Sequence, residues 1–261
     1  MTSTRAFFSF PEITDPGRHA EYNEWHMLDH RPENLALQGV VHGDRWVLSP
    51  DCAAVGTRAD PLLRDFHYMA MYWFAEPADD SEREWKALGR STLEQGRRPE
   101  LSWTRRSVTG FFRPVRGRMS DRSQISLAAL PFRPTRGVYV RICELRDPAS
   151  AATGTLDRWY DRVRVPQLLE AAGAVGGWTF RSERLQLAGA RPDRLPHWRL
   201  QLIHLDEDPL DYVADLAERD RAREDPVDSS ELESVVFEGP LRSIVPWQWN
   251  WFDEPAPTTT H

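Results

Sequence analysis

Residues Tyr22 to Trp46 read YNEWHMLDHRPENLALQGVVHGDRW, a pattern that predicts an amphipathic helix, a proline, an apolar loop and then a strand. The same design returns from Leu156 to Phe180 as LDRWYDRVRVPQLLEAAGAVGGWTF. Matching residues recur in register: Trp25 with Trp159, Pro32 with Pro166, Leu35 with Leu169, Gly39 with Gly173, Gly43 with Gly177, and Trp46 with Phe180. We infer that the chain is a tandem duplication, and that its first copy, which carries two histidines, holds the chemistry.

The repeat extends along the whole chain. Each copy reads as strand, helix, strand, strand, helix, strand, and Pro77 and Pro209 mark equivalent turns 132 residues apart. This is the order of a ferredoxin-like unit, whose helices cover only one face of its sheet. In a chain with two copies, the uncovered face of each sheet can pack against that of the other. We therefore expect an α+β fold in which two tandem ferredoxin-like units pair their sheets into an intrachain barrel.

The expected boundaries follow from this repeat. The first unit spans residues 1–115, an arginine-rich linker spans 116–136, the second unit spans 137–253, and a flexible tail spans 254–261. We expect the linker to be a solvated connector and residues 49–65 to form a loop. The first helix should end near His30, because Pro32 disfavours helical torsions in the residue before it. The segment WQWNWF should be a strand with Trp247, Trp249 and Trp251 buried on one face.

Composition excludes several function classes. The net charge of −7 argues against a nucleic-acid surface, and no apolar run is long enough to span a membrane. The N-terminus lacks a secretion signal, so we expect a cytoplasmic protein. Cys52 and Cys143 form no metal motif, and the only lysine, Lys86, lies in a polar helical segment unsuited to Schiff-base chemistry. No phosphate-binding glycine motif is present, so we expect no cofactor.

The two histidines of the first copy, His26 and His30, share one helix face because they are four residues apart, and Asp29 lies on nearly the same side. A helix C-terminus favours a cation, which would promote protonation of His30. We predict that His30 is a general acid or base assisted by His26 and Asp29. The alternative is a surface histidine that caps the last carbonyls of its helix.

Residues 29–40, DHRPENLALQGV, resemble the EthD-like branch of the dimeric α+β barrel superfamily. That signature is a histidine two residues before a proline, then an apolar stretch and a glycine, and His30, Pro32 and Gly39 fill these places. The resemblance implies kinship with polyketide cyclases, cofactor-free oxygenases and muconolactone isomerase-like enzymes. Arg164 replaces the histidine in the second copy, so an identical second site is in doubt. Arg164 is either a recognition group for an anion or carbonyl, or a helix-end cation.

A substrate pocket beside the histidines would be lined by aromatic and cationic side chains. On the third strand, His67 and Trp73 share one face and Tyr72 lies on the other, and the sequence does not say which face meets the helices. The alternative is that these aromatic side chains only pack in the hydrophobic core. The predicted substrate-binding residues are Tyr22, Trp25, Arg45, Trp46, His67, Tyr72, Trp73 and Arg164.

A metal site is the rival interpretation of the histidine pair. Zinc-binding helices of this spacing carry a glutamate after the first histidine, whereas Met27 follows His26 here. A third ligand would come from Asp29, Glu33, His42 or His67. We expect no metal.

These observations favour an enzyme that acts by proton transfer on an aromatic, polyketide-like or other apolar carbonyl compound, as a cyclase, isomerase or lyase. A cofactor-free monooxygenase of an aromatic substrate is the first alternative. A non-catalytic binding protein for a hydrophobic metabolite is the second. The expected partner is a small hydrophobic or aromatic substrate, with homodimer formation left open.

Overall fold

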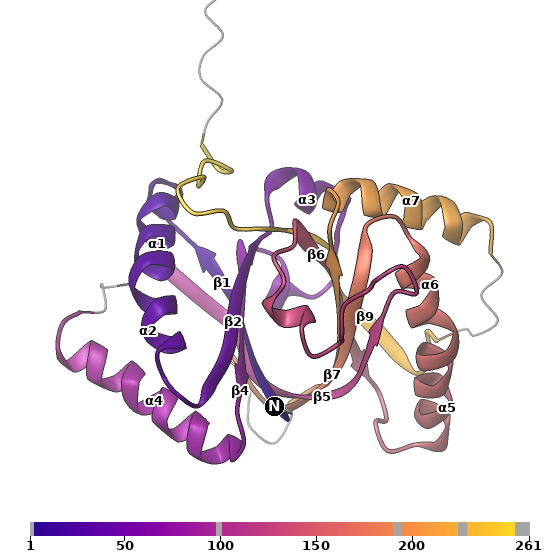
Figure 1. The fold of residues 1–261 in the computed structure, drawn as a ribbon, viewed down its shortest axis with the longest axis horizontal. Coiled ribbons are helices and arrows are strands. Elements are labelled where there is room, and N and C mark those ends of the chain that lie inside the picture. The colour runs from indigo at the N-terminus through magenta and orange to yellow at the C-terminus, as the bar shows by residue number, and fades with distance from the viewer. Residues whose placement is uncertain (1–2, 98–100, 190–194, 224–228, 254–261) are drawn as a thin grey trace, which may run out of the picture.

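The chain folds into an antiparallel β-barrel with helices packed on its outside (Figure 1). A computed structural model describes residues 3–97, 101–189, 195–223 and 229–253. The strands follow the order β2-β4-β1-β5-β7-β8-β6-β9, and a pairing of β2 with β9 closes the ring. The closing contacts join Trp46 to Ser243 and Val47 to Arg242. The α+β class and the barrel are confirmed.

The first half of the chain supplies four barrel strands and the helices on one side of them. Figure 1 shows α1, α2 and α4 together on that side. Its elements are β1 (Arg5–Ile13), η1 (Pro16–Arg18), α1 (His19–Trp25), the π-helical turn η2 (His26–His30), α2 (Arg31–Leu35), β2 (Val40–Val47), α3 (Pro50–Val55), β3 (Thr57–Arg58), η3 (Pro61–Leu63), β4 (Tyr68–Phe74), α4 (Ala78–Glu94) and β5 (Thr104–Met119).

The second half follows the same order on the opposite side, except that its described residues contain no counterpart of α3, β3 and η3. Its helices α5, α6 and α7 lie across the barrel from α1, α2 and α4, whereas α3 of the first half lies beside α7 (Figure 1). Its elements are η4 (Leu130–Phe132), β6 (Gly137–Leu145), α5 (Ala151–Trp159), the π-helical turn η5 (Tyr160–Arg164), α6 (Val165–Glu170), β7 (Ala174–Leu187), β8 (His197–Leu205), α7 (Pro209–Arg221) and β9 (Glu233–Ser243).

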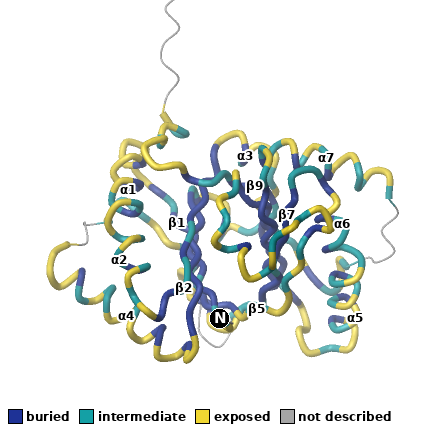
Figure 2. The backbone as a smooth tube through the Cα atoms, in the orientation of Figure 1, coloured by how far each residue is buried: buried dark blue, intermediate teal, exposed yellow. Residues whose placement is uncertain are grey.

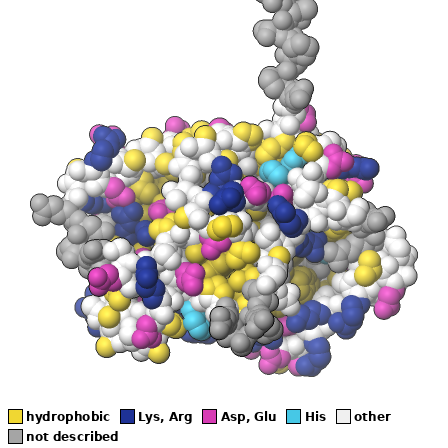
Figure 3. All heavy atoms as spheres, turned by 180° about the vertical axis from the view of Figure 1, so that it is seen from behind, with side chains coloured by type: hydrophobic (Ala, Val, Ile, Leu, Met, Phe, Trp, Pro, Cys, Tyr) yellow, Lys and Arg dark blue, Asp and Glu magenta, His cyan; other side chains and the backbone are white. Residues whose placement is uncertain are grey.

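Strand β4 shows why these sequences form a barrel rather than an open sheet. Every residue from Tyr68 to Phe74 is buried, because one face of the strand meets the barrel interior and the other meets the helices. Met69, Met71 and Trp73 belong to the interior core. Figure 2 shows the same pattern across the molecule, with buried strands and helices exposed on their outer sides. From behind, apolar side chains gather near the centre of the face, with charged groups mostly around them (Figure 3).

The first helix does not end near His30, and that prediction is wrong. It passes through the π-helical turn η2 and continues to Leu35. The N–H of Arg31 bonds to the carbonyl of His26, five residues back, so the turn is wider than in an α-helix. A wider turn relieves the clash between the ring of Pro32 and the preceding turn. The second half contains the same kind of π-helical turn, η5, immediately before α6.

Three further expectations need correction. Residues 49–65 contain α3, β3 and η3 rather than a plain loop. The start of the predicted linker is part of β5, which pairs with β7 as far as Met119, and Leu130 in its middle is completely buried. The tryptophan segment forms turns and no strand, with Trp247 71% exposed. The predicted tail at 254–261 lies outside the described residues. No helix among the described residues is long and apolar enough to cross a membrane.

The C-terminal segment, residues 245–253, leaves the second half and returns to the first (Figure 1). Its Trp249, Trp251 and Phe252 pack against the cluster around Tyr22. The ring of Phe252 stacks on His19 with centroids 4.1 Å apart. We call this segment the C-terminal strap, since it holds the beginning of α1 against the barrel.

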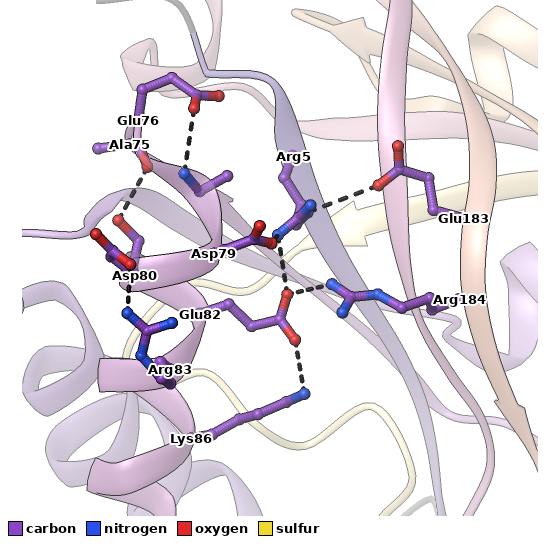
Figure 4. Close-up of polar contacts among 12 residues, drawn as sticks. Arg5, Ala75, Glu76, Asp79, Asp80, Glu82, Arg83, Lys86, Glu183 and Arg184 are labelled. Carbon is purple, nitrogen blue, oxygen red and sulfur yellow. Dashed lines mark hydrogen bonds and ion pairs between the residues drawn. The ribbon is translucent and has the colours of Figure 1, made fainter.

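A charged cluster also joins the two halves, at the start of α4 (Figure 4). The buried carboxylate of Glu82 accepts hydrogen bonds from Arg5 at 3.1 Å, Lys86 at 2.6 Å and Arg184 of β7. Arg5 also contacts Asp79 at 2.6 Å and Glu183 of β7 at 3.6 Å. One buried acid therefore compensates three cations from three different elements.

We predict that Glu82→Ala lowers the free energy of unfolding by about 2–3 kcal/mol, because it leaves three neighbouring cations without their shared acceptor. The matched control is Asp80→Ala on the same helix, whose ion pair with Arg83 is exposed. That variant should change stability by less than about 0.5 kcal/mol. Urea denaturation measures both, and equal losses in the two variants would contradict the assigned role of Glu82.

Candidate functional site

Arg45 of β2 is the centre of a buried polar group between the first helix and the outer face of the barrel. Its side chain is 1% exposed. The guanidinium lies 5.1 Å from the ring centroid of Tyr22 and 5.3 Å from that of Tyr68. Nη2 donates a hydrogen bond to Oδ1 of Asn23 at 3.2 Å. Aromatic faces and one amide oxygen therefore surround the charge.

The guanidinium of Arg45 has no acid within ion-pair distance among the described residues, and the neighbouring carboxylate of Asp44 accepts the backbone N–H of Arg45 instead. Within the described part of the chain, Nε and Nη1 of Arg45 have no hydrogen-bond partner. Burial lowers the pKa of this guanidinium, and the neighbouring tyrosines oppose that effect. A buried cation without a counter-ion is costly, so this arrangement suits an anionic group arriving from outside.

His26 lies beside Arg45 and is 4% exposed. Its Nδ1 has no hydrogen-bond partner among the described residues. Burial holds the pKa of His26 well below its ordinary value, and the nearby charges of Arg45 and His30 act in the same direction. The imidazole is therefore neutral at neutral pH and has a lone pair that can accept a proton.

His30 lies between His26 and the surface. Its ring is partly exposed, stacks on Trp25 with centroids 4.7 Å apart, and meets the His26 ring edge-on at 5.0 Å. Nε2 of His30 is 3.2 Å from Nδ2 of Asn34, which also donates to the hydroxyl of Tyr72 at 3.3 Å. Hydrogen bonds therefore join His30, Asn34 and Tyr72, and the buried ring of His26 meets this group through its edge-on contact with His30.

Local structure explains how these groups meet. The π-helical turn η2 begins at His26 and ends at His30, so both rings project from one widened turn. On β2, Gly43 leaves room for Tyr72, because a Cβ there would lie 2.4 Å from the Tyr72 ring. We call the whole group the helix-side cluster, which consists of Tyr22, Asn23, His26, His30, Asn34, Arg45, Tyr68 and Tyr72.

The structure brings together only part of the predicted site. Tyr22, Trp25, His26, His30, Arg45 and Tyr72 lie on the helix side. Asp29 is exposed, so the predicted assistance of His30 by Asp29 does not apply. The helix ends a turn after His30, so the argument that a helix C-terminus promotes protonation of His30 does not apply either. Trp46 and Trp73 belong to the barrel interior, on the opposite face of the sheet. One pocket cannot include both sets.

Two other predicted residues have structural partners elsewhere. Nδ1 of His67 accepts the backbone N–H of Ile13 at 3.0 Å, and its ring packs on Phe252 of the C-terminal strap. Arg164, in the second half, forms a bidentate pair with Asp220 at 2.6 and 2.7 Å. That pairing supports the helix-end interpretation of Arg164 over ligand recognition.

Sequence reasoning missed Asn23, Asn34 and Tyr68. Asn23 donates hydrogen bonds to the hydroxyl of Tyr68 and to the carbonyl of His19, both at 2.8 Å. Asn23 and Asn34 are three or four residues from a histidine of the turn, which was a usable signal. Tyr68 shares the strand face of Tyr72, so choosing the face would have identified it.

In the second half, the buried arginine near the π-helical turn is paired with a carboxylate. Tyr160 opens the π-helical turn where His26 opens the first. Its hydroxyl donates to Glu233 at 2.5 Å, and the guanidinium of Arg199 lies 3.6 Å from its ring centroid. Arg199 and Glu233, both about 2% exposed, form an ion pair. The buried arginine of this half has its own carboxylate, and no ligand is needed to balance it.

Among the described residues, no three or more His, Cys, Asp or Glu side chains are arranged to hold a metal ion. The ligands considered for zinc are dispersed. Asp29 is exposed, Glu33 pairs with Arg97, and His67 contacts Ile13. The helix-side cluster itself offers histidines, amides, phenols and a guanidinium. These groups suit binding of an anion and transfer of a proton.

No protein-family model matches the sequence, and no curated protein matches it. Among solved structures, an anthrone oxidase-like protein aligns with a TM-score of 0.51 at 9% identity, over 94% of this chain and 92% of that one. A "putative monooxygenase" from Fusobacterium nucleatum subsp. nucleatum ATCC 25586 aligns with a TM-score of 0.48 at 8% identity, over 93% and 94%. The anthrone oxidase-like protein shares the fold of this chain, which is of the dimeric α+β barrel kind.

We predict opposite stability effects for the two buried arginines. Arg45→Met should be neutral or stabilising, within about 1 kcal/mol, because it removes an uncompensated charge. Arg199→Met should cost about 3 kcal/mol, because it removes the nearest cation from the buried Glu233 and leaves that carboxylate only Tyr160 and the longer contact with Arg141 at 3.6 Å. Urea denaturation of both variants at pH 7 is the measurement. If Arg45→Met lost as much stability as Arg199→Met, the charge of Arg45 would have a partner within the protein.

Proposed function

We propose that the protein is an enzyme that removes a proton from an apolar carbonyl compound and stabilises the resulting anion against Arg45. The observation that carries this proposal is a buried guanidinium without a carboxylate, placed beside a neutral histidine. A preorganised cation in a water-poor site stabilises charge that develops during a reaction. The aromatic rings of Tyr22 and Tyr68 suit an aromatic substrate.

The roles follow from position. The carbonyl oxygen of the substrate would face the unpartnered nitrogens of Arg45. Nδ1 of His26 would accept the proton from the adjacent carbon, and the enolate or phenolate would be held by the guanidinium. His30, 5.0 Å from His26 and partly exposed, would pass the proton to solvent. Sequence analysis predicted His30 as the general acid or base, but the burial of His26 and the electrostatic influence of Arg45 on it favour His26 as the base.

Isomerisation, aldol-type cyclisation and elimination of a leaving group from the β-carbon, which is a lyase reaction, all begin with this proton removal, and we keep them as the proposed reaction types. A cofactor-free oxidation is the second candidate. It is favoured by the similarity in fold to an anthrone oxidase-like protein. In that reaction the carbanion would react with O2, the CH2 group would become a carbonyl, and the second oxygen atom would leave as water.

We further propose that the chain arose by tandem duplication and belongs to the EthD-like branch. The support is the repeated order of elements and the shared π-helical turn before Pro32 and Pro166. The proposed units remain 1–115 and 137–253, with residues 116–136 between them. A small aromatic substrate and a cytoplasmic location complete the proposal.

Anthrone is a suitable test substrate because its ketone acidifies the CH2 group opposite. In D2O under nitrogen, NMR measures how fast that group exchanges its protons. We expect the wild-type protein to accelerate exchange, and His26→Gln and Arg45→Met each to lower the rate by about 10²-fold or more. Asp29→Asn is the matched control on the same turn and should keep the wild-type rate, since its side chain is exposed.

The pH profile gives a second readout of the same role. A base must be neutral to act, and the pKa of His26 is lowered, so it stays neutral below pH 6.5. The acid limb of kcat/KM should therefore fall below pH 6.5, and an acid limb at or above 6.5 would exclude His26. Oxygen uptake in air would identify the oxidase reaction. Binding without exchange or uptake would identify a metabolite-binding protein.

A further inference from the structure

A cavity of about 560 Å³ opens at the mouth of the barrel, in a different place from the helix-side cluster. Its walls come from the inner face of the sheet, with His42 of β2, Trp73 of β4 and Trp178 of β7 among them. Helix-side residues such as Tyr72 and Arg45 lie on the outer face of the same strands. The volume is in the range of small-molecule sites.

The cavity is mainly apolar and aromatic. The rings of Trp73 and Trp178 meet at 5.3 Å between centroids, so one wall joins a strand of each half. Phe132 faces His42 edge-on at 5.1 Å. Burial and the charge of Arg31 lower the pKa of His42 to about 4, so this ring is neutral at neutral pH. Flat aromatic walls of this kind favour an aromatic guest.

The segment between the two units forms the roof. Leu127, Ala128 and Phe132 line the cavity from this segment, while Leu130 anchors it in the core. Gly117 of β5 permits this arrangement, because a Cβ there would lie 2.5 Å from Leu127 and 2.8 Å from Trp178. The segment predicted as a solvated connector therefore builds a binding surface.

The rim carries positive charge. Arg113 and Arg116 of β5 line the cavity, and their side chains are 55% and 61% exposed. No aspartate or glutamate is among the described residues that line it. The nearest acids make long contacts, 3.8 Å from Arg113 to Glu183 and 3.4 Å from Arg116 to Asp161. An anionic group at the mouth is thus favoured over a neutral or cationic one.

We propose that this barrel-mouth cavity is a second ligand site, which binds an aromatic anion with its ring between Trp73, Trp178 and Phe132 and its charge toward Arg113 and Arg116. The ligand spans strands of both halves and the roof segment, so its binding stabilises the closed barrel. This site is separate from the one proposed for proton transfer, and either can fail without the other.

The probe is 8-anilinonaphthalene-1-sulfonate, an aromatic sulfonate whose emission rises in apolar surroundings. We expect one molecule per chain by fluorescence titration, and a higher Tm in its presence. Ala128→Trp fills the cavity from an exposed position of the roof and should weaken binding by at least about tenfold. Its Tm without probe should match that of the wild type, which shows that the fold is intact.

Two comparisons test where the aromatic ring and the charge of the bound probe lie. The double variant Arg113→Gln, Arg116→Gln should weaken the sulfonate about fivefold and leave neutral N-phenyl-1-naphthylamine within about twofold. Arg83→Gln, on the exposed face of α4, is the charge-matched control and should change neither. Arg45→Met should also leave the affinity unchanged. Wild-type affinity in folded Ala128→Trp, or equal losses for both probes, would overturn the proposal.

Discussion

The whole molecule depends on the mutual burial of two apolar sheet faces. Each half presents a four-stranded sheet with helices on one side only, and the other side carries large side chains such as Phe8, Trp46 and Leu200. These meet in a single interior core, and the pairing of β2 with β9 removes the last free edges of the ring. Because the barrel is shared, neither half has a complete core of its own.

This common framework holds two very different polar clusters beside its two π-helical turns. Each cluster contains a buried arginine from a different strand of the repeat, Arg45 of β2 in the first half and Arg199 of β8 in the second, and only Arg199 forms an ion pair with an acid among the described residues. Arg199 and Glu233 neutralise each other, whereas Arg45 is surrounded by tyrosines and asparagine. The contrast is informative because the scaffold is the same. The role proposed for Arg45 in proton transfer rests on this difference between the two buried arginines.

The order of strands and helices was predictable from the sequence, because turn residues and hydrophobic periods recur in both copies. The faces of β4 were not, since a strand buried on both sides has no polar face to mark solvent, and YMAMYWF is apolar or aromatic throughout. Pro32 was misleading because a π-helical turn accommodates it. His26 and Arg45 were identified by residue type, but the missing counter-ion is a property of three-dimensional neighbours. The roof segment was misjudged because its arginines outweigh the few side chains that anchor it.

The C-terminal strap links the local stability of the histidine helix to a segment that follows the last barrel strand. The ring of Phe252 covers the beginning of α1 by stacking on His19, and Trp249 and Trp251 pack on the same cluster. This cover is held by side-chain packing and contributes no strand to the barrel. Local opening of the strap would therefore expose the start of the histidine helix to solvent while the barrel stays closed.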